Sequence, residues 1–168
     1  MNHPKIAIKV KNFGTMTAEL YPEFAPKTVE NFHSLAEKDF FAGLIFHRVI
    51  KGFMIQGGGY TASFDSRETD AIRGEFKANG CMENTLRHTR GVLSMARTSD
   101  PDSASSQFFV MHADAPHLDG QYAGFGKLID GFDVLDKIAT TRTGSIGFYM
   151  QDVPRETIEI ETIEVLSR

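Results

Sequence analysis

Residues Phe46 to Tyr60 read Phe-His-Arg-Val-Ile-Lys-Gly-Phe-Met-Ile-Gln-Gly-Gly-Gly-Tyr. Two short apolar runs of strand character are separated by Lys51-Gly52 and end at three glycines, a pattern typical of a β-hairpin. The segment places a permanent cation, Arg48, and an amide, Gln56, beside large apolar side chains. It contains no nucleophile, acid pair or metal cluster. A site built from it can bind and polarise a ligand, but has few ways to cut one.

Length and composition indicate one globular domain over residues 1–168, with 41% hydrophobic and 24% charged residues. The net charge is −4 and the basic residues are dispersed, so we expect no nucleic-acid partner. No apolar stretch is long enough for a membrane span or a cleaved signal, so we expect no membrane association. Cys81 is the single cysteine, which excludes an intrachain disulfide. The cytoplasm is the simplest predicted location.

Hydrophobic periodicity predicts a fold made mainly of short strands. Apolar residues alternate on both sides of Asn12-Phe13-Gly14, which predicts an opening hairpin. Three-to-four spacing predicts one amphipathic helix over Pro26 to Lys38 and another around Val134 to Ala139, where Asp130 and Asp133 loosely resemble a capping box. Further strands are predicted at the following positions: Leu44 to Ile50, Phe53 to Gln56, Gly91 to Ala96, Gln107 to Met111 and Ala123 to Ile129.

Two irregular regions carry predictions of their own. Thr61 to Gly80 is rich in loop-forming residues, and we expect an ordered loop with one short strand. Near the end of the chain the apolar phase slips by one residue between Ile160 and Ile163, which predicts a β-bulge. Short strands with two distant helices favour a closed antiparallel barrel or a sandwich, and the pattern alone does not choose between them.

Several residues suggest other chemistries, each with a simpler explanation. Ser94 lies in a buried strand pattern outside any G-x-S-x-G elbow, so we interpret it as a packed hydroxyl. The glycines at 57–59 lack the downstream Gly-Lys of a phosphate loop, and tight turning explains them. The spacing of four possible metal ligands matches no known metal motif; they are His112, Asp114, His117 and Asp119. Three carboxylates alternate with aliphatic residues, as on a half-solvated strand, which disfavours a catalytic carboxylate pair; they are Glu159, Glu161 and Glu164.

Arg48 is the strongest individual candidate, because an inward arginine among apolar neighbours must meet a ligand or a polar partner. Taken alone, it fits a surface arginine equally well. Phe53, Met54 and Phe109 are also ambiguous, since apolar strand residues are usually core.

Three segments together strongly resemble the signature segments of cyclophilins, the peptidyl-prolyl cis/trans isomerases. They are the Phe46 stretch through Gly58, Gly91-Val-Leu-Ser-Met-Ala, and Ser106-Gln-Phe-Phe-Val. The likeness spans nearly the whole chain and is greatest to the single-domain bacterial cytosolic kind, with a similar loop at Met95 to Ala104. It implies a closed eight-stranded antiparallel β-barrel capped by two α-helices, with the active groove on the outer face.

The resemblance also implies a role for each matching residue. Arg48 becomes the catalytic arginine, assisted by Gln56 and Phe53. The expected substrate-binding residues are His47, Met54, Ala96, Arg97, Gln107, Phe109, His117, Leu118 and Tyr122. His117 stands where many eukaryotic members have tryptophan, a cyclosporin contact, so weakened affinity for cyclosporin is expected.

The implied activity is rotation about X-Pro bonds in peptides and folding proteins, by a monomer that uses no metal or cofactor. One alternative is a non-catalytic proline-peptide-binding or chaperone module that uses the same groove. Another is a small hydrolase, for which the sequence offers no recognisable pair of nucleophile and base. The connection from Thr141 to Glu156 contains Phe148-Tyr149-Met150, interpreted as a buried anchor in preference to a partner surface.

Overall fold

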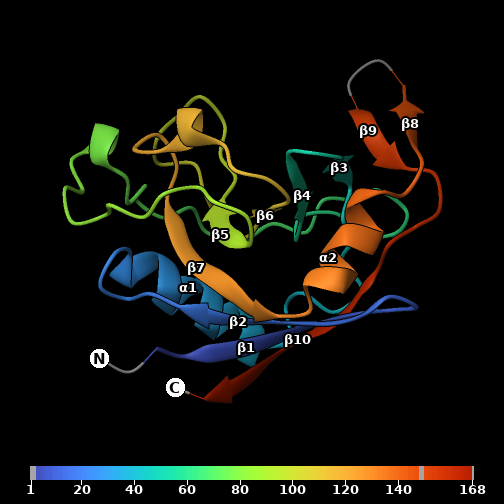
Figure 1. Cartoon of the computed structure of the whole chain (residues 1–168), viewed down its shortest axis with the longest axis horizontal. Helices are drawn as coiled ribbons and strands as arrows, with labels where there is room; N and C mark the ends of the chain where they lie inside the picture. The colour runs from blue at the N-terminus through green and yellow to red at the C-terminus, as the bar shows by residue number, and fades with distance from the viewer. Residues whose placement is uncertain (1–2, 148–149, 168) are drawn as a thin grey trace.

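The computed structural model describes residues 3–147 and 150–167, and it is mainly β with two α-helices (Figure 1). The strands of the main sheet are β1 (Lys5–Val10), β2 (Gly14–Leu20), β3 (Arg48–Ile50), β4 (Met54–Gly57), β5 (Val92–Met95), β6 (Phe108–Met111), β7 (Gly124–Asp130) and β10 (Ile160–Ser167). The helices are α1 (Pro26–Glu37) and α2 (Phe132–Ala139), with short 3-10 turns at Lys77–Asn79 and Pro116–Leu118. The predicted opening hairpin and both helices are confirmed.

The eight strands form one antiparallel sheet in the order β10-β1-β2-β7-β5-β6-β4-β3. Figure 1 shows the sheet curled, with β7 lying between β5 and β2 and its arrow ending beside β2. The strand predicted from Leu44 to Ile50 is shorter than expected, because only Arg48 to Ile50 pairs with β4. Leu44 and Ile45 instead form isolated bridges to Thr61 and Glu159. The curled antiparallel sheet is thus observed, and complete closure remains a prediction.

The predicted β-bulge is present in β10. Val10 pairs with Ile160 and Lys9 pairs with Thr162, so Glu161 is the extra residue. The bulge absorbs the slip in the apolar pattern, and Ile160 and Ile163 are consequently both buried.

Phenylalanine rings fill the space enclosed by the sheet and α1. Phe32 of α1 contacts Phe41, Phe108 and Phe125, with ring centroids 4.9, 5.3 and 5.1 Å apart. All four side chains are fully buried. Aromatic pairs in such tilted and edge-on arrangements add to the free energy gained by burial alone. The apolar face of α1 therefore packs against the main core.

The loop from Thr61 to Gly80 supports α1 in a way that the sequence did not predict. Its buried Glu75 accepts hydrogen bonds from the Thr28 backbone N–H (2.6 Å) and hydroxyl (2.8 Å). α1 has no side-chain cap from its own N-cap residue, Ala25, so Glu75 supplies the missing acceptor. The expected short strand in this loop is wrong, because the loop contains isolated bridges and a 3-10 turn instead. At Gly74, the side chains of Asp102 and Asn79 bond to the backbone N–H and carbonyl that a strand partner would otherwise engage.

Helix α2 also begins differently from the prediction. Its N-cap is Gly131, with φ at 87° and no side-chain cap, so the capping box at Asp130 and Asp133 is wrong. Glycine is required at this position because a Cβ would lie 2.4 Å from the Thr15 carbonyl oxygen. Backbone geometry, and not a side-chain acceptor, therefore defines the start of this helix.

The connection after α2 contains a further hairpin, β8 (Thr143–Ile146) paired with β9 (Met150–Pro154). Met150 is half-buried, while Phe148 and Tyr149, the other two residues of the expected anchor, lie outside the described residues. No helix in residues 3–147 and 150–167 is long and apolar enough to cross a membrane.

Candidate active site

Strand alternation divides the apolar side chains between two faces of the sheet. In β6, Phe108 and Val110 belong to the main core, whereas Phe109 and Met111 join a second cluster with Met54. Period-two alternation requires this division, because successive strand side chains point to opposite faces. The sequence ambiguity of Phe109 and Met54 is thereby resolved: they are buried, but outside the main core.

A small cavity of about 130 Å³ opens over this second cluster. Its lining consists entirely of residues expected at the site: Arg48, Phe53, Met54, Gln56, Ala96, Arg97, Phe109, Leu118 and Tyr122. They come from β3, the β3–β4 turn, β4, the segment just after β5, β6, and the 3-10 turn at 116–118 with the residues that follow it. Six of these residues belong to the second cluster or pack against it, and Arg48 lines the same cavity, so it can hold a small apolar group beside a hydrogen-bond donor.

A chain of polar side chains runs along one edge of the cavity. Arg48 Nη1 donates to Gln56 Oε1 at 3.3 Å, and Gln56 Nε2 donates to Gln107 Oε1 at 3.0 Å. The antiparallel register places Arg48 opposite Gln56, which explains the first contact. Gln107 lines an adjoining cavity of about 140 Å³ together with Gln56 and Arg97. Gly59 allows the close packing, because a Cβ there would lie 2.4 Å from the Gln107 side chain.

Arg97 is a fixed part of the wall. Its guanidinium carbon lies 4.7 Å from the ring centroids of both Phe76 and Tyr122. Its Nε and Nη2 donate to the Gln121 carbonyl at 3.2 and 2.7 Å. Backbone and aromatic partners thus occupy this cation, which leaves Arg48 as the more available of the two.

His47 and His117 lie at the periphery of the cavity. His47 is buried against Tyr60 and lines, with Arg48, a neighbouring cavity of about 340 Å³. Burial, together with the Arg48 charge, lowers the pKa of His47 to about 4, so this imidazole is neutral at physiological pH. His117 is exposed and stacks on Phe53, with centroids 5.9 Å apart and planes at 28°.

A Ser-His-Asp arrangement lies behind the cavity and was missed in the sequence. Ser94 Oγ is 2.8 Å from His88 Nε2, and His88 Nδ1 is 3.1 Å from Asp119 Oδ1. The sequence offered no recognisable pair of nucleophile and base because the three residues are brought together only by the fold. Ser94 is nevertheless fully buried, as first interpreted, and His88 stacks on Phe109. Burial lowers the pKa of His88 despite its carboxylate neighbour. The arrangement supports the cavity floor and has no access to substrate.

The side chains once considered as metal ligands have separate partners. Asp119 contacts His88, Asp114 accepts the Arg90 backbone N–H at 2.9 Å, and His112 contacts Asp136 at 3.0 Å. Across the described ranges, no three His, Cys, Asp or Glu side chains are grouped to hold a metal ion. Glu164 of β10 forms a cross-strand ion pair with Lys9, at 2.7 Å.

Comparisons with known proteins agree with this geometry. A family model described as "Cyclophilin type peptidyl-prolyl cis-trans isomerase/CLD" matches residues 5–165. A peptidyl-prolyl cis-trans isomerase of Acinetobacter baylyi is 44% identical, over 93% of this chain and 82% of the relative. Peptidyl-prolyl cis-trans isomerase B of Escherichia coli is 41% identical, over 92% of this chain and 95% of the relative.

Solved structures extend the likeness to three dimensions. A Cryptosporidium parvum cyclophilin type isomerase superposes with a TM-score of 0.79 at 31% identity, over 99% of both chains. The same enzyme in the presence of the dipeptide Ala-Pro gives a TM-score of 0.77 at 32% identity, over 98% of this chain and 99% of the other.

Proposed function

We propose, since the chain belongs to the cyclophilin type peptidyl-prolyl cis-trans isomerase family, that X-Pro bonds rotate in the cavity over the second apolar cluster, with Arg48 as the catalytic group. The chain is a peptidyl-prolyl cis-trans isomerase, and its relatives do not favour the alternative of a non-catalytic module. The observation that carries the assignment is the position of Arg48 beside Phe53, Met54 and Phe109 in one small cavity.

The X-Pro bond resists rotation because the nitrogen lone pair is delocalised into the carbonyl group. The barrier is about 18–20 kcal/mol, and uncatalysed exchange takes on the order of tens to hundreds of seconds. Twisting the bond localises the lone pair on nitrogen. A donor aimed at that nitrogen binds the twisted state more strongly than either planar state, which is the requirement for catalysis.

Arg48 has the chemistry for this role. An arginine presents five N–H donors, and Gln56 holds one Nη1 group of Arg48, which orients the guanidinium and leaves other donors for substrate. The proline ring would rest on Phe53, Met54, Phe109 and Leu118, which exclude water and strengthen the interaction with the cation. Gln56 and Gln107 would hold the peptide backbone. The catalytic step then needs no covalent intermediate.

The proposed substrates are proline-containing peptides and folding proteins, in keeping with the dipeptide used for the Cryptosporidium parvum structure. The whole chain would act as one domain, as a monomer in the cytoplasm. Cyclosporin would bind weakly, because an exposed imidazole at His117 offers less apolar surface than an indole.

We also infer that the curled sheet closes into a barrel. The support lies at its two edges, β3 and β10. The Phe46 N–H donates to the Ile158 carbonyl at 2.9 Å, and the Ile160 N–H donates to the Leu44 carbonyl at 2.7 Å. These bonds join the chain just before β3 to the start of β10.

The assignment of Arg48 is tested by substitution. Arg48→Ala should lower kcat/KM by at least about 100-fold, a loss of roughly 2.7 kcal/mol, because the donor to the prolyl nitrogen is gone. Arg48→Lys should restore the rate only in part, since an ammonium lacks the planar fork that fixes donor direction. The measurement is NMR exchange spectroscopy on an Ala-Ala-Pro-Phe peptide, with circular dichroism to establish folding. A folded Arg48→Ala variant with a near-normal rate would refute the assigned role.

A further inference from the structure

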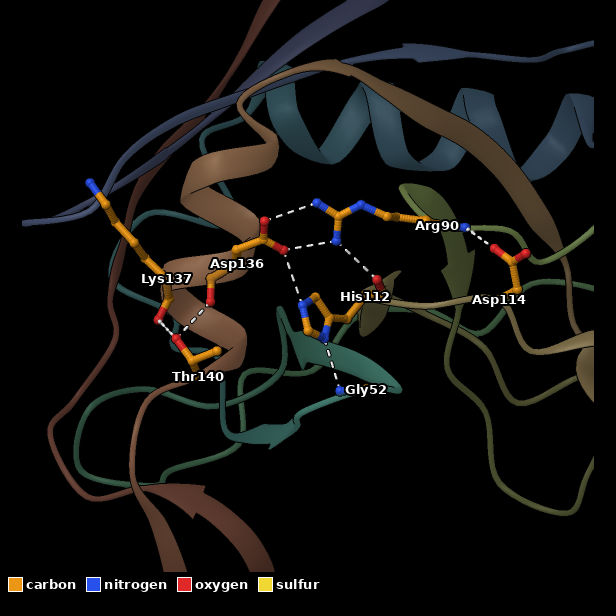
Figure 2. A network of polar contacts seen from close by, with 7 residues as sticks. All are labelled: Gly52, Arg90, His112, Asp114, Asp136, Lys137 and Thr140. Carbon is orange, nitrogen blue, oxygen red and sulfur yellow. Dashed lines mark hydrogen bonds and ion pairs between the residues drawn. The ribbon is translucent and has the colours of Figure 1, made fainter.

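A second polar network, outside the cavity, joins three elements around His112 (Figure 2). His112 follows β6 directly. Its Nδ1 lies 2.8 Å from the backbone nitrogen of Gly52, in the turn between β3 and β4. Its Nε2 lies 3.0 Å from Asp136 Oδ1 of α2. The imidazole therefore bridges the β3–β4 turn and helix α2, which are far apart in the sequence.

The contact with Gly52 determines the protonation state of the ring. A backbone N–H can only donate, so His112 Nδ1 must accept and carries no proton. The single proton of the neutral ring then lies on Nε2, facing the Asp136 carboxylate. The network is thus satisfied by one tautomer of neutral histidine, and it loses the Gly52 bond when Nδ1 is protonated.

The carboxylate end of the bridge is held firmly. Arg90 Nη1 and Nη2 contact the two Asp136 oxygens at 2.8 and 2.9 Å, and Arg90 Nη1 also donates to the His112 carbonyl at 3.1 Å. The hydrogen bonds from Arg90 lower the pKa of Asp136, so it is ionised at neutral pH. The Arg90 guanidinium also lies over the Phe132 ring at 5.3 Å. Asp136 is consequently a fixed acceptor for His112.

The other end of the bridge reaches the proline cavity through Phe53. The His112 backbone N–H donates to the Phe53 carbonyl at 2.9 Å, next to the Gly52 bond. Phe53 lines the cavity, and β3, which carries Arg48, is an edge strand with β4 as its one ladder partner. The position of the β3–β4 turn therefore affects both the apolar wall and the cation.

We propose that His112 is a positioning residue for the isomerase reaction, whose neutral side chain fixes the β3–β4 turn against α2 and so holds Phe53 and Arg48 in place. The proposal rests on the function assigned to the cavity. Protonation of Nδ1 turns an acceptor into a donor that faces the Gly52 N–H, and the turn is released. Catalysis should accordingly decrease as the pH falls through the titration of His112.

Two charged groups face the ring and its partners. The Asp136 carboxylate of α2 contacts Nε2, and the Arg90 guanidinium contacts Asp136 and the His112 carbonyl. Asp114 contacts the Arg90 backbone, Lys51 adjoins Gly52 in the turn, and Lys137 points away from His112 (Figure 2). Imidazoles change charge between about pH 5 and pH 8, which covers the range of an isomerase assay.

Two variants and one control test the proposal. His112→Ala removes both hydrogen bonds, and His112→Asn retains an amide oxygen in about the position of Nδ1 but cannot be protonated. His33→Ala is the matched control, since His33 also has a side chain 14% exposed and pairs with a carboxylate, Glu37, on α1 away from the cavity. Exchange spectroscopy on the Ala-Ala-Pro-Phe peptide gives kcat and KM from about pH 5.5 to 7.5.

At about pH 7.5, His112→Ala should lower kcat/KM roughly three- to tenfold, and His112→Asn should recover most of this loss. The wild-type rate should fall toward pH 5.5 with the midpoint of the His112 NMR titration, and this component should vanish in both variants but persist in His33→Ala. In the wild-type protein, imidazole ¹⁵N shifts should show an unprotonated Nδ1. This last measurement requires no variant to fold.

Three outcomes would overturn the proposal: a protonated Nδ1 in the neutral ring, a pH profile unchanged by both His112 substitutions, or a loss of thermal stability with unchanged kcat/KM of the folded protein. Each is distinguishable from failure of the proposed function. If Arg48→Ala abolishes activity and the His112 variants do not alter it, the cavity assignment stands and the positioning role is wrong.

Discussion

Arg48 and Arg90 differ in whether their charge is neutralised by a carboxylate partner. Arg90 is engaged by both oxygens of Asp136, and its charge is neutralised locally. Arg48 is exposed and contacts the neutral amide of Gln56, and within the described residues no carboxylate lies within ion-pair distance of it. An unpaired guanidinium retains its full attraction for a developing lone pair. In the proposed mechanism, the absence of an ion pair at Arg48 therefore leaves its guanidinium available to the twisted amide.

The exposed position of His117 leads to a prediction about inhibitor binding. His117→Trp should tighten cyclosporin binding by about tenfold, roughly 1.4 kcal/mol, because an indole beside Phe53 adds apolar surface and an N–H donor. Isothermal titration calorimetry measures the change, and the peptide isomerisation rate should stay within about twofold. His117→Ala is the control and should not tighten binding. An unchanged dissociation constant for the tryptophan variant would show that this position does not limit affinity.

At the residue scale, the lining of the cavity could be predicted but its support could not. Arg48, Phe53 and Gln56 lie in one continuous segment whose sequence resembles a known family. The residues behind that lining are paired over long distances, as Ser94 is with His88 and Asp119, or His112 with Asp136. No local pattern indicates such pairs, because each partner is placed by a different element.

At the scale of elements, α1 depends on a carboxylate 47 residues away. Glu75→Ala should lower the free energy of unfolding by about 3 kcal/mol, because it leaves the buried N–H and hydroxyl of Thr28 without an acceptor at a helix N-terminus. Urea unfolding followed by far-ultraviolet circular dichroism measures the loss.

Glu68 offers a matched control in the same loop, since it is exposed. Glu68→Ala should change the free energy of unfolding by less than about 0.5 kcal/mol. Equal effects of the two substitutions would mean that the Glu75 contact adds nothing to stability.

Elements with strong periodicity were predicted well, and those held by tertiary contacts were not. The slip between Ile160 and Ile163 correctly indicated the bulge at Glu161, because a buried face cannot tolerate a change of phase. The predicted N-cap of α2 was wrong because the close approach of the Thr15 backbone requires glycine at position 131, and the local sequence does not reveal that contact. The strand predicted in the loop from Thr61 to Gly80 was also wrong, because contacts such as that of Gly74 with Asp102 lie far apart in the sequence.

At the scale of the whole molecule, two apolar clusters occupy opposite faces of one sheet. Periodicity was sufficient to predict a mainly β fold, but it could not assign the outer cluster, since Phe108 and Phe109 look alike in sequence. The resemblance to a family supplied that assignment. Periodicity therefore predicted the fold class, and the resemblance to a family predicted which strand residues form the site.

Burial of His47 leads to a prediction about the pH dependence of global stability. Its pKa is about 4 in the folded chain and about 6.5 in an unfolded one, so the unfolded state binds more protons between these values. Stability should therefore fall as the pH decreases from about 6.5 to 4, with about 2 kcal/mol lost from this residue by pH 5. Urea unfolding at about pH 7.5 and 5 should show that His47→Gln reduces the difference. The same pH sensitivity in the variant would contradict the assignment to His47.

The separation of the two clusters also bears on how such a protein can change over evolutionary time. Phe32, Phe41 and Phe125 belong to the main core and do not line the outer cavity, while Ala96, His117 and Tyr122 lie around that cavity. If the cavity binds proline as proposed, lineages can exchange the outer residues, and with them the preferred neighbours of the proline, while the scaffold is inherited intact.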